Sequence, residues 1–329
     1  MHRKRRFFLG FERVREKNEG NGGDLMIQNT AELISKQDGL TLSVLWTEPE
    51  KKVRGVVQIS HGMSEHKERY LPFMKFLAGH GYAAVIHDHR GHGGSVREKE
   101  DLGYFYNTKE KGIIEDLHQV TRWAKDRFAG LPFYMLGHSM GTLVARNYLK
   151  QYDEELDKLV LTGPPSKNPA VDAGLWLAKV QKKLRGGSYR SKEIQLLAFG
   201  PFASRFRKEG SPSAWICSDE KVVEAYDQSP LCGFVFTADG FESLFHLMKS
   251  AYSKKGWNVR NQKLPILFLG GEEDPCIGNG RKFVQELQFL KAVGYQKVTG
   301  KRYPGMRHEI LNEQGKVEVF RNILLYLEK

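Results

Sequence analysis

Long apolar runs are absent from this chain of 329 residues, and no stretch approaches the roughly 20 apolar residues that a membrane-spanning helix requires. The apolar cluster near the start, residues 7–11, is too short for a signal peptide, and charged residues follow it at once, so we do not expect export. Cysteine is scarce as well, and no C-x-x-C pair occurs among Cys217, Cys232 and Cys276. An odd number of unpaired cysteines is typical of reduced thiols, and the sequence therefore predicts a cytoplasmic protein.

Sequence signatures for metals, nucleotides and nucleic acids are missing too. His87, His89 and His92 offer imidazole groups, but no cysteine or carboxylate follows at the spacing of a zinc site. The glycine-rich loop 91–94 lacks the strand and helix that flank a dinucleotide site, and we expect Arg90 beside it to pair with a carboxylate. Helix-turn-helix, zinc-finger and aromatic RNA-binding patterns do not occur. We therefore expect no cofactor, no metal and no specific nucleic-acid partner.

Positive charge is in excess, with 51 lysines and arginines against 39 acidic residues and a net charge of +12. It is concentrated at residues 2–6 and in the middle of the chain, which carries Lys179, Lys182, Lys183, Arg185, Arg190, Lys192, Arg205, Arg207 and Lys208. A basic surface attracts anionic lipid headgroups, so peripheral association with a membrane surface is one interpretation. The other is that the charge only keeps the protein soluble, and the sequence leaves both open.

Short apolar segments that alternate with helical patterns make up most of the chain. Eight of them have the composition of strands: 26–35, 40–47, 53–60, 82–87, 131–136, 159–162, 264–269 and 298–303. The first two are joined at Asp38-Gly39, which is typical of a hairpin turn. Between the strands, 109–128 has the apolar spacing of a long amphipathic helix. This alternation predicts an α/β fold with a mostly parallel, eight-stranded sheet and helices on both faces.

The alternation stops between residues 164 and 262, a segment rich in aromatic side chains. We interpret 164–262 as a helical cap inserted into a core formed by 25–163 and 263–329, with a basic, flexible segment, 1–24, in front of it. The aromatic residues would either line an apolar slot over the core or pack into a small core of the cap itself. They are Trp176, Phe199, Phe202, Phe206, Trp215, Phe234, Phe236, Phe241 and Phe245.

The most informative motif is G-x-S-x-G at residues 137–141, which stands between an apolar strand and a helical segment. This context is typical of a nucleophile elbow, a sharp turn that exposes the serine hydroxyl above the sheet. The two glycines leave room where side chains would collide across such a turn. The motif predicts Ser139 as a nucleophile.

A serine nucleophile needs a histidine to accept its proton and a carboxylate to orient that histidine. Only His246 and His308 follow Ser139, and His308 lies in a loop near the C-terminus, after the last predicted strand. His246 falls in an apolar helical pattern, where a helix face of the cap explains it better. We therefore predict His308 as the base.

The acid should follow a buried strand, as Glu272-Glu273-Asp274 does after 264–269. Asp274 is the preferred acid, because its place in the loop after the strand aims it at the histidine. Glu273 is the nearest rival, and we expect Asp227 and Asp239 to be surface or cap-forming residues of the middle segment.

Backbone N–H groups must also hold the oxyanion that forms during acyl transfer. One donor is expected from Met140, the residue after the nucleophile, and the other from the loop that follows strand 53–60, at Met63. The side chains of Met63 and Met140 would flank an apolar acyl group, and ordinary packing explains them equally well.

Five motifs occur in order along the chain: His61-Gly62-x-x-Glu65-His66, Asp88-His89-Arg90-Gly91-His92-Gly93-Gly94-Ser95, Gly137-His138-Ser139-Met140-Gly141, Gly271-x-x-Asp274 and His308-Glu309. Together they resemble the monoacylglycerol lipase and lysophospholipase branch of the α/β-hydrolase superfamily, from about residue 27 to the C-terminus. The resemblance implies an α/β-hydrolase fold with a mobile cap, a small-molecule acyl ester or lipid substrate, and hydrolysis of a single acyl ester without a cofactor.

The resemblance also implies roles for individual residues. Ser139, Asp274 and His308 match the catalytic positions, and Met63 and Met140 match the oxyanion donors. The first motif makes further residues candidates for substrate binding: His61, Gly62, Glu65 and His66. Where the lipases often carry a small residue, this chain has Met63, and we expect a narrower acyl pocket.

Other functions stay open at this stage. A thioesterase or a peptidase could use the same three catalytic side chains, although neither has a sign of its own in the sequence. From a different class, the chain could be a non-catalytic binding protein that has kept the fold. The complete set of Ser139, Asp274 and His308 favours an ester hydrolase.

Overall fold

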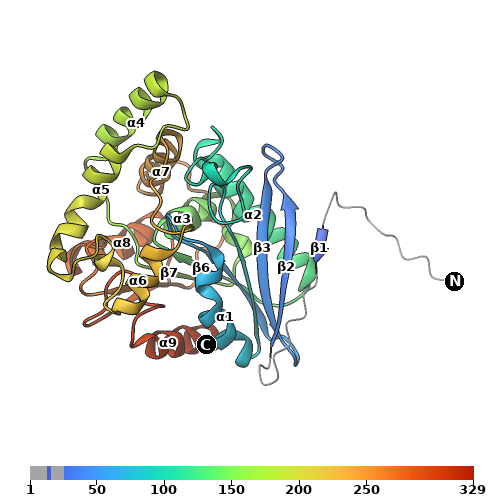
Figure 1. Cartoon of the computed structure of the whole chain (residues 1–329). Helices are drawn as coiled ribbons and strands as arrows, with labels where there is room; N and C mark the ends of the chain where they lie inside the picture. Colours follow the sequence, from blue (N-terminus) through green and yellow to red (C-terminus); the bar gives the residue numbers. More distant parts are fainter. Residues whose placement is uncertain (1–12, 16–25) are drawn as a thin grey trace.

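The computed structural model describes residues 13–15 and 26–329, which are built around one twisted sheet (Figure 1). The strands are β1 (Arg13–Arg15), β2 (Met26–Ile34), β3 (Thr41–Pro49), β4 (Gly55–Ser60), β5 (Tyr82–His87), β6 (Phe133–His138), β7 (Lys158–Thr162), β8 (Ile266–Gly271) and β9 (Val298–Tyr303). Their order in the sheet is β1-β2-β3-β5-β4-β6-β7-β8-β9. The pairs β1–β2, β2–β3 and β3–β5 are antiparallel, and every later pair is parallel.

The eight predicted strands and the mostly parallel sheet are thus confirmed, and β1 adds a ninth strand at the edge. β1 lies inside the segment 1–24 that was expected to be flexible throughout, and that expectation is wrong for residues 13–15, which pair with β2. The rest of 1–24 lies outside the described residues.

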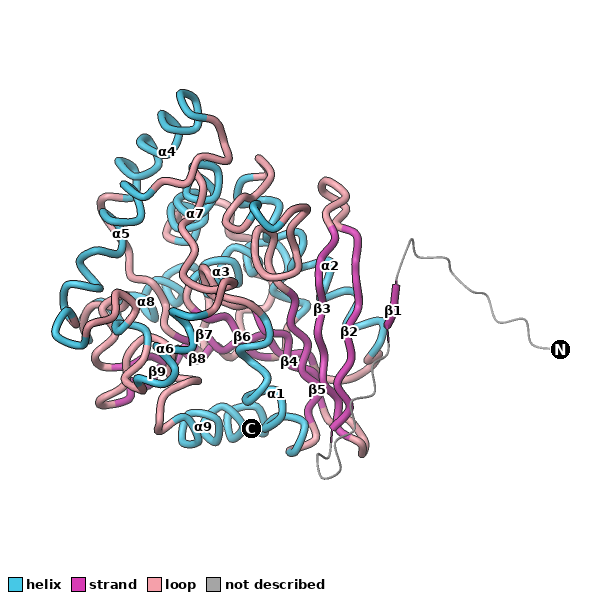
Figure 2. The backbone as a smooth tube through the Cα atoms, in the orientation of Figure 1, coloured by secondary structure: helices cyan, strands magenta, loops and turns pink. Residues whose placement is uncertain are grey.

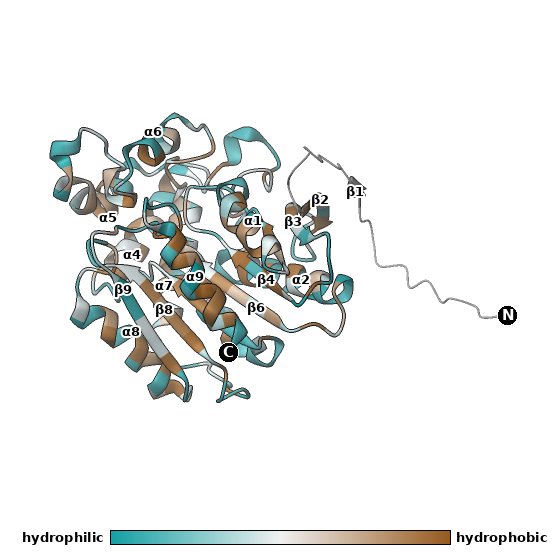
Figure 3. Ribbon diagram, turned by 90° about the horizontal axis from the view of Figure 1, so that it is seen from below, coloured by the Kyte–Doolittle hydropathy of each residue, from teal (hydrophilic) through white to brown (hydrophobic). Residues whose placement is uncertain are grey.

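Five helices cover the two faces of the sheet (Figures 2 and 3): α1 (Leu71–Gly79), α2 (Lys109–Arg127), α3 (Met140–Tyr152), α8 (Gly280–Val293) and α9 (Lys316–Glu328). On one face, α1 and α9 pack over Val57 and the strand side chains that point the same way. On the other face, α2, α3 and α8 pack over Val56 and its partners. Consecutive strand residues point to opposite faces, so strands covered on both sides must be apolar throughout, as β4 and β5 largely are.

The helices between β7 and β8 are α4 (Val171–Arg185), α5 (Lys192–Arg205), α6 (Glu220–Gln228) and α7 (Ala238–Ala251). Short 3₁₀ helices complete the fold: η1 (Lys67–Tyr70), η2 (Lys99–Asp101), η3 (Asp153–Glu155), η4 (Arg207–Glu209) and η5 (Ala214–Ile216). Polar N-cap residues begin three of the helices between β7 and β8: Ser191 Oγ accepts the N–H of Ile194, Asp219 Oδ1 accepts that of Lys221, and Thr237 Oγ1 accepts that of Gly240. None of the helices in the described part of the chain combines the length and the apolar character that crossing a membrane requires.

The cap helices differ in how deeply they are buried. Helix α7 contributes Phe241 and Phe245 to the main hydrophobic cluster, together with Phe236 just before it. Helices α4 and α5 stand out from the body of the molecule (Figure 1). Trp176 on α4 is 66% exposed. Some aromatic residues of the cap therefore belong to the main hydrophobic cluster, while others are exposed to solvent. The sequence alone did not distinguish the two groups.

The glycine-rich loop after β5 is anchored by a buried ion pair, as expected for Arg90. Arg90 Nε donates to Asp116 Oδ2 at 2.8 Å, and Arg90 Nη1 lies 3.1 Å from Asp38 Oδ2. Arg90 and Asp116 are both fully buried. Because an unpaired charge in the interior is costly, this pair specifies where the loop must lie.

Four histidines in and next to that loop pack together. His61 and His89 have ring centroids 4.4 Å apart, and His92 and His87 make edge-on contacts with His61 and His89, respectively. All four side chains are buried. Burial lowers the pKa of His92 to about 4 and that of His87 to about 3, and it places the pKa of His61 and of His89 well below the usual value. The folded protein therefore holds these rings neutral near pH 7.

This cluster predicts a loss of stability in mild acid. When the pH falls from 7.5 to 5, His92 takes up a proton in the unfolded chain but not in the folded protein. Because of this residue, the free energy of unfolding is about 2 kcal/mol lower at pH 5 than at pH 7.5. His92→Gln should reduce the difference in unfolding free energy between the two pH values, as measured by urea titration. The exposed His80→Gln is the control, and a pH dependence equal to that of the wild type in both variants would contradict the prediction.

Candidate active site

Ser139 occupies the turn between β6 and α3 in a strained conformation. Its φ of 51° and ψ of −118° are rare for a residue with a side chain. The turn is held on both sides, because Ser139 N donates to Thr162 O at 3.0 Å and Thr142 N donates to Ser139 O at 2.9 Å. This conformation projects the hydroxyl away from the helix, beyond the carboxyl ends of the parallel strands.

Gly141 allows the turn to sit this close to the sheet. A Cβ at this position would lie 2.0 Å from the Ser60 carbonyl oxygen and 2.7 Å from that of His61. Both atoms belong to the backbone at the end of β4, so neither can move aside easily. The first turn of α3 reaches its place only because residue 141 has no side chain.

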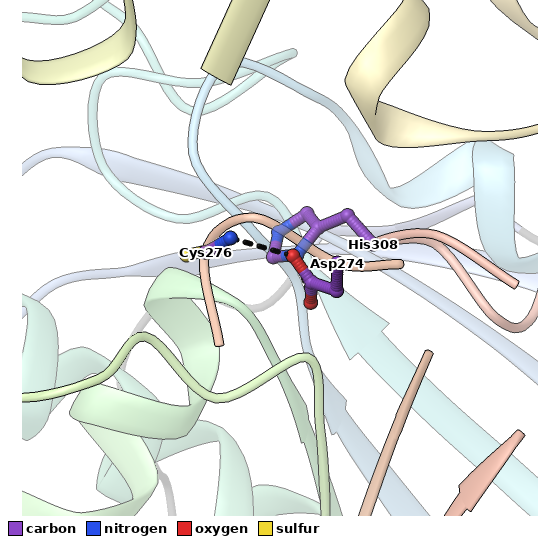
Figure 4. Close-up of side chains that lie close together, drawn as sticks. All are labelled: Asp274, Cys276 and His308. Atoms are coloured by element: carbon purple, nitrogen blue, oxygen red, sulfur yellow. Dashed lines mark hydrogen bonds and ion pairs between the residues drawn. The ribbon is translucent and has the colours of Figure 1, made fainter. Parts of the chain in front are cut away.

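The structure brings Ser139, His308 and Asp274 into one hydrogen-bonded chain. His308 Nε2 lies 2.8 Å from Ser139 Oγ, and His308 Nδ1 lies 2.8 Å from Asp274 Oδ2. The other oxygen of Asp274 accepts the backbone N–H of Cys276 at 2.8 Å (Figure 4). The three side chains come from the ends of β6, β8 and β9, which meet at one edge of the sheet.

The surroundings of His308 favour its protonated form. Burial is the largest single effect and by itself would lower the pKa of His308, but the charge and hydrogen bond of Asp274, together with the charges of Glu309 and Glu65, raise the pKa above its usual value. The side chain of His308 is only 3% exposed. A histidine in such a place accepts a proton readily and remains stable once charged, which are the properties of a general base.

The rival residues lie elsewhere. Glu273 Oε2 is 4.0 Å from Arg307 Nε, and His246 on α7 lies within 4 Å of Glu110 and Glu242. Asp227 is exposed and accepts a hydrogen bond from Ser211.

Asp239 was expected to be a surface or cap-forming residue of the middle segment; it is not at the surface, but is fully buried in the first turn of α7. One of its oxygens accepts the N–H groups of Phe105 and Asn107, and the other binds Lys182. Because these partners lie in the loop before α2 and on α4, Asp239 ties three elements together.

Asp274, Cys276 and His308 are also the three possible metal ligands that lie within 4.8 Å of one another in the described part of the chain (Figure 4). Both ring nitrogens of His308 already make hydrogen bonds. Burial raises the pKa of the Cys276 thiol well above its usual value, which keeps it protonated and a poor ligand. The arrangement therefore suits proton transfer better than metal binding.

A cavity of about 270 Å³ opens above Ser139. Its walls come from the loop 61–65, from the ends of β6 and β9, and from the cap. The cap supplies apolar side chains, among them Leu196, Phe199 and Trp215, and the Trp215 ring lies 5.0 Å from that of His308. At the carboxyl ends of the strands, the chain thus places a serine hydroxyl that is hydrogen-bonded to a histidine at the floor of a partly apolar cavity.

The two predicted oxyanion donors differ in where their side chains lie. In the hydrogen bonds described for residues 26–329, the backbone amides of Met63 and Met140 have no acceptor within the chain. Met63 lines the cavity. The expectation that the Met140 side chain also flanks the acyl group is wrong, because it is buried in the main hydrophobic cluster.

Of the four candidate substrate-binding residues, two line the cavity and two do not. Gly62 and Glu65 line the cavity. His61 does not, because it is buried and its Nε2 accepts the N–H of His89 at 2.8 Å. His66 does not either, since its Nδ1 lies 2.7 Å from Glu68 Oε2.

Arg69 is a residue that the sequence analysis missed, and it reaches both Glu65 and Glu309 beside the cavity. The signal that was available is its spacing of four residues from Glu65.

The sheet order, the strained serine turn and the loops at the strand ends define an α/β-hydrolase. The match to known families is consistent with this: residues 51–315 fit the family described as serine aminopeptidase, S33. The chain belongs to this family.

Several curated relatives match most of the chain. A monoacylglycerol lipase of Mycolicibacterium smegmatis is 28% identical over 82% of this chain and 86% of its own length. The phospholipase YtpA of Bacillus subtilis is 26% identical over 84% of this chain and 96% of its own length. Among solved structures, a thermostable carboxyl esterase from Bacillus coagulans in complex with glycerol is 25% identical, with a TM-score of 0.85 over 92% of this chain and 98% of its own. These comparisons place the chain among the serine-hydrolase-type lipases and esterases, which are carboxylic ester hydrolases.

Gly141→Ala tests the close approach of α3 to β4. The added methyl group would collide with two carbonyl oxygens, so we expect the free energy of unfolding to fall by about 3 kcal/mol or more. Gly79→Ala is the matched control, because a Cβ there meets no atom within 4 Å and the backbone is not strained. Thermal unfolding should give a lower melting temperature for Gly141→Ala than for Gly79→Ala. Equal melting temperatures would show that the close approach of α3 to β4 does not require a glycine at residue 141.

Proposed function

We propose that the chain hydrolyses the carboxylic ester of a single-acyl lipid, a lysophospholipid or a monoacylglycerol, through an acyl-enzyme formed on Ser139. The observation that carries the proposal is the hydrogen-bonded chain Ser139–His308–Asp274 at the floor of a partly apolar cavity. The cavity is near the lower end of the size range of small-molecule sites, about 300 to 1,000 Å³, which favours one acyl chain over two. The names of the relatives, a monoacylglycerol lipase and a phospholipase, point to the same class of substrate.

In the proposed mechanism, His308 Nε2 accepts the proton of Ser139 as Oγ attacks the ester carbonyl. The backbone amides of Met63 and Met140 hold the negative oxygen of the tetrahedral intermediate. The protonated His308 then gives its proton to the leaving alcohol, and an acyl-enzyme remains. His308 next activates a water molecule, which releases the fatty acid and restores Ser139. Asp274 keeps the ring oriented throughout and stabilises its charged form.

We propose that the segment 164–262 acts as a lid in this reaction. Leu196 and Phe199 on α5 and Trp215 in η5 provide the apolar lining on the lid side. Burying an acyl chain against them removes apolar area from water and supplies binding energy. Gly62 of the first motif and Met63 next to it, on the core side, would border the alcohol part of the substrate.

Two other functions remain alternatives. A peptidase or thioesterase would use the same three side chains, and the family description names an aminopeptidase. A binding protein that has kept the fold would not need the 2.8 Å contact between Ser139 and His308, which therefore favours an enzyme.

A hydrolysis panel tests the proposed function. Monoacylglycerols, lysophospholipids, acyl thioesters and amino-acid anilides are each incubated with wild type and with Ser139→Ala. We expect turnover of at least one single-acyl oxygen ester, a loss of at least about 1,000-fold in Ser139→Ala, and no amide cleavage above background. Labelling of the wild type, and not of the variant, by a fluorophosphonate identifies the nucleophile.

The outcomes of this panel separate the alternatives. Equal hydrolysis by wild type and Ser139→Ala would overturn the assignment of the nucleophile. A well-folded wild type that neither hydrolyses esters nor reacts with the fluorophosphonate would favour the binding protein. Preferential cleavage of anilides would favour a peptidase.

We further propose that the outer side of the cap docks on an anionic lipid surface. Four large apolar side chains on α4 and α5 are 66–76% exposed: Trp176, Leu184, Leu196 and Leu197. Basic side chains are exposed on the same two helices, among them Lys179, Lys183, Arg185 and Lys192. Apolar side chains flanked by positive charge are typical of interfacial helices. Because Leu196 also lines the cavity, such a surface would deliver substrate at its entrance.

Co-sedimentation with phospholipid vesicles tests this docking. We expect binding to vesicles that contain phosphatidylglycerol, little binding to neutral phosphatidylcholine vesicles, and a decrease of about tenfold in affinity in Leu184→Ser/Leu197→Ser, which removes exposed apolar area. Leu325→Ser on α9 is the control, since Leu325 is also exposed (55%) but lies outside the cap. An equal effect of the control would show that the cap is not the docking surface.

A further inference from the structure

Two carboxylates and one guanidinium are buried together beside the proposed catalytic centre. Glu65 belongs to the loop 61–65 after β4, Arg69 to η1, and Glu309 follows His308 directly. Glu65 is 3% exposed and Glu309 is 5% exposed, while the side chain of Arg69 is 12% exposed. Charges removed from water to this extent are stable only when each finds partners.

Glu65 is fully engaged by the chain itself. Its Oε1 accepts the backbone N–H of Gly62 at 2.5 Å and the hydroxyl of Tyr70 at 2.9 Å. Its Oε2 accepts Arg69 Nη1 at 2.7 Å. The Gly62 amide directly precedes Met63, the proposed oxyanion donor, so Glu65 fixes the peptide that leads into this donor.

Glu309 binds the same guanidinium and shares Arg69 Nη1 with Glu65. Arg69 Nη1 donates to Glu309 Oε1 at 2.7 Å, and Nη2 donates to Oε2 at 2.6 Å. A two-pronged contact of this kind restricts both the distance and the orientation of its partners. Because Glu309 directly follows His308 in the chain, its contact with Arg69 also restricts where the backbone of the proposed base can lie.

The cap closes on the same cluster. The Arg69 guanidinium lies over the Tyr226 ring of α6, 4.9 Å from its centroid, and Tyr226 Oη donates to Ser64 O at 3.0 Å. Glu309 N donates to Ile216 O at 2.7 Å. Thus the loop 61–65, the loop after β9 and the cap all contact one guanidinium or its two partners.

We propose that Glu65, Arg69 and Glu309 form a positioning bridge that holds the donor amide of Met63 and Nε2 of His308 at a fixed separation around Ser139. This inference rests on the proposed function. It assigns Glu65 to the support of the oxyanion donor rather than to substrate binding, because both of its oxygens already have partners within the chain. The three residues are positioning residues, since they act through Met63 and His308.

Glu65→Gln is the first test. With the amide oxygen kept toward Gly62, the amide nitrogen faces the Arg69 guanidinium, so the bridge is broken while its volume is retained. We expect kcat for ester hydrolysis to fall by about 10- to 100-fold with KM changed less than about threefold. A substrate-binding role would instead raise KM, and a purely structural role would lower the melting temperature without lowering kcat.

The pH profile supplies a second readout. Groups that bear on His308 are Ser139 and Asp274, which it contacts, His138 from β6, Cys276, and the bridge residues Glu65, Arg69 and Glu309. In the wild type the acid limb of kcat/KM should lie above pH 6.5, because His308 must lose its proton to act as a base. Glu65→Gln removes a negative charge that favours the charged ring, so the acid limb should move to lower pH. Arg69→Gln removes the balancing positive charge and should move it to higher pH.

Glu286→Gln is the matched control. Glu286 is 2% exposed and its Oε2 accepts Arg146 Nη1 at 2.7 Å, so this variant also breaks a buried ion pair, between α3 and α8. We expect it to keep kcat within about threefold of the wild type and to leave the acid limb in place. If Glu65→Gln does not fold, Tyr70→Phe removes one donor to Glu65 without changing its charge, and should lower kcat about threefold or more.

Hydrogen exchange of the backbone amides reports on the bridge without any substrate. Glu65→Gln should accelerate exchange in both 61–66 and 306–312, and Glu286→Gln should accelerate neither. Unchanged exchange, together with a kcat equal to that of the control, would overturn the bridge. A wild type without ester hydrolysis and without fluorophosphonate labelling would instead overturn the proposed function, and the exchange result would still decide whether the two loops are coupled.

Discussion

His308 makes two hydrogen bonds of 2.8 Å, one to Ser139 and one to Asp274. The positions of the loops at the strand ends are what allow both hydrogen bonds to form at once. An imidazole can bridge a hydroxyl and a carboxylate only if both lie in its plane and within reach. The parallel sheet achieves this because β6, β8 and β9 all end at the same edge, so that three short loops meet there. The strained turn at Ser139 then sets the height of the hydroxyl above that edge.

Buried charges determine where the loops lie. Arg90 with Asp116 anchors the loop after β5, Arg146 with Glu286 joins α3 to α8, and Arg69 joins Glu65 to Glu309. A buried ion pair adds little to stability compared with apolar packing, but a chain arrangement that separates its members leaves a charge without a partner. These pairs therefore exclude alternative loop positions, and one of them lies directly beside the proposed catalytic centre.

The cap combines two kinds of helix with different tasks. Helix α7 is packed into the main hydrophobic cluster and behaves as part of the core, whereas α4 and α5 expose large apolar side chains to solvent. Both kinds carry large apolar and aromatic residues, so composition alone does not distinguish them. The distinction arises because α7 contacts α2 and α3, while the outer sides of α4 and α5 have no such neighbour among the described residues.

Local patterns in the sequence determined the strands, the elbow and the order of the candidate residues. Strand β5 begins and ends where its apolar segment predicted, at Tyr82–His87, because burial on both faces requires an unbroken apolar run. Strand β9 also has its predicted bounds, Val298–Tyr303, although it lies at the edge of the sheet and its middle residues are exposed. Side-chain directions and distant pairings were decided only by the tertiary structure. The buried side chain of Met140, the four-histidine cluster around His61 and the contact of Arg69 with Glu309, 240 residues away, depend on how separate loops pack, which no local pattern encodes.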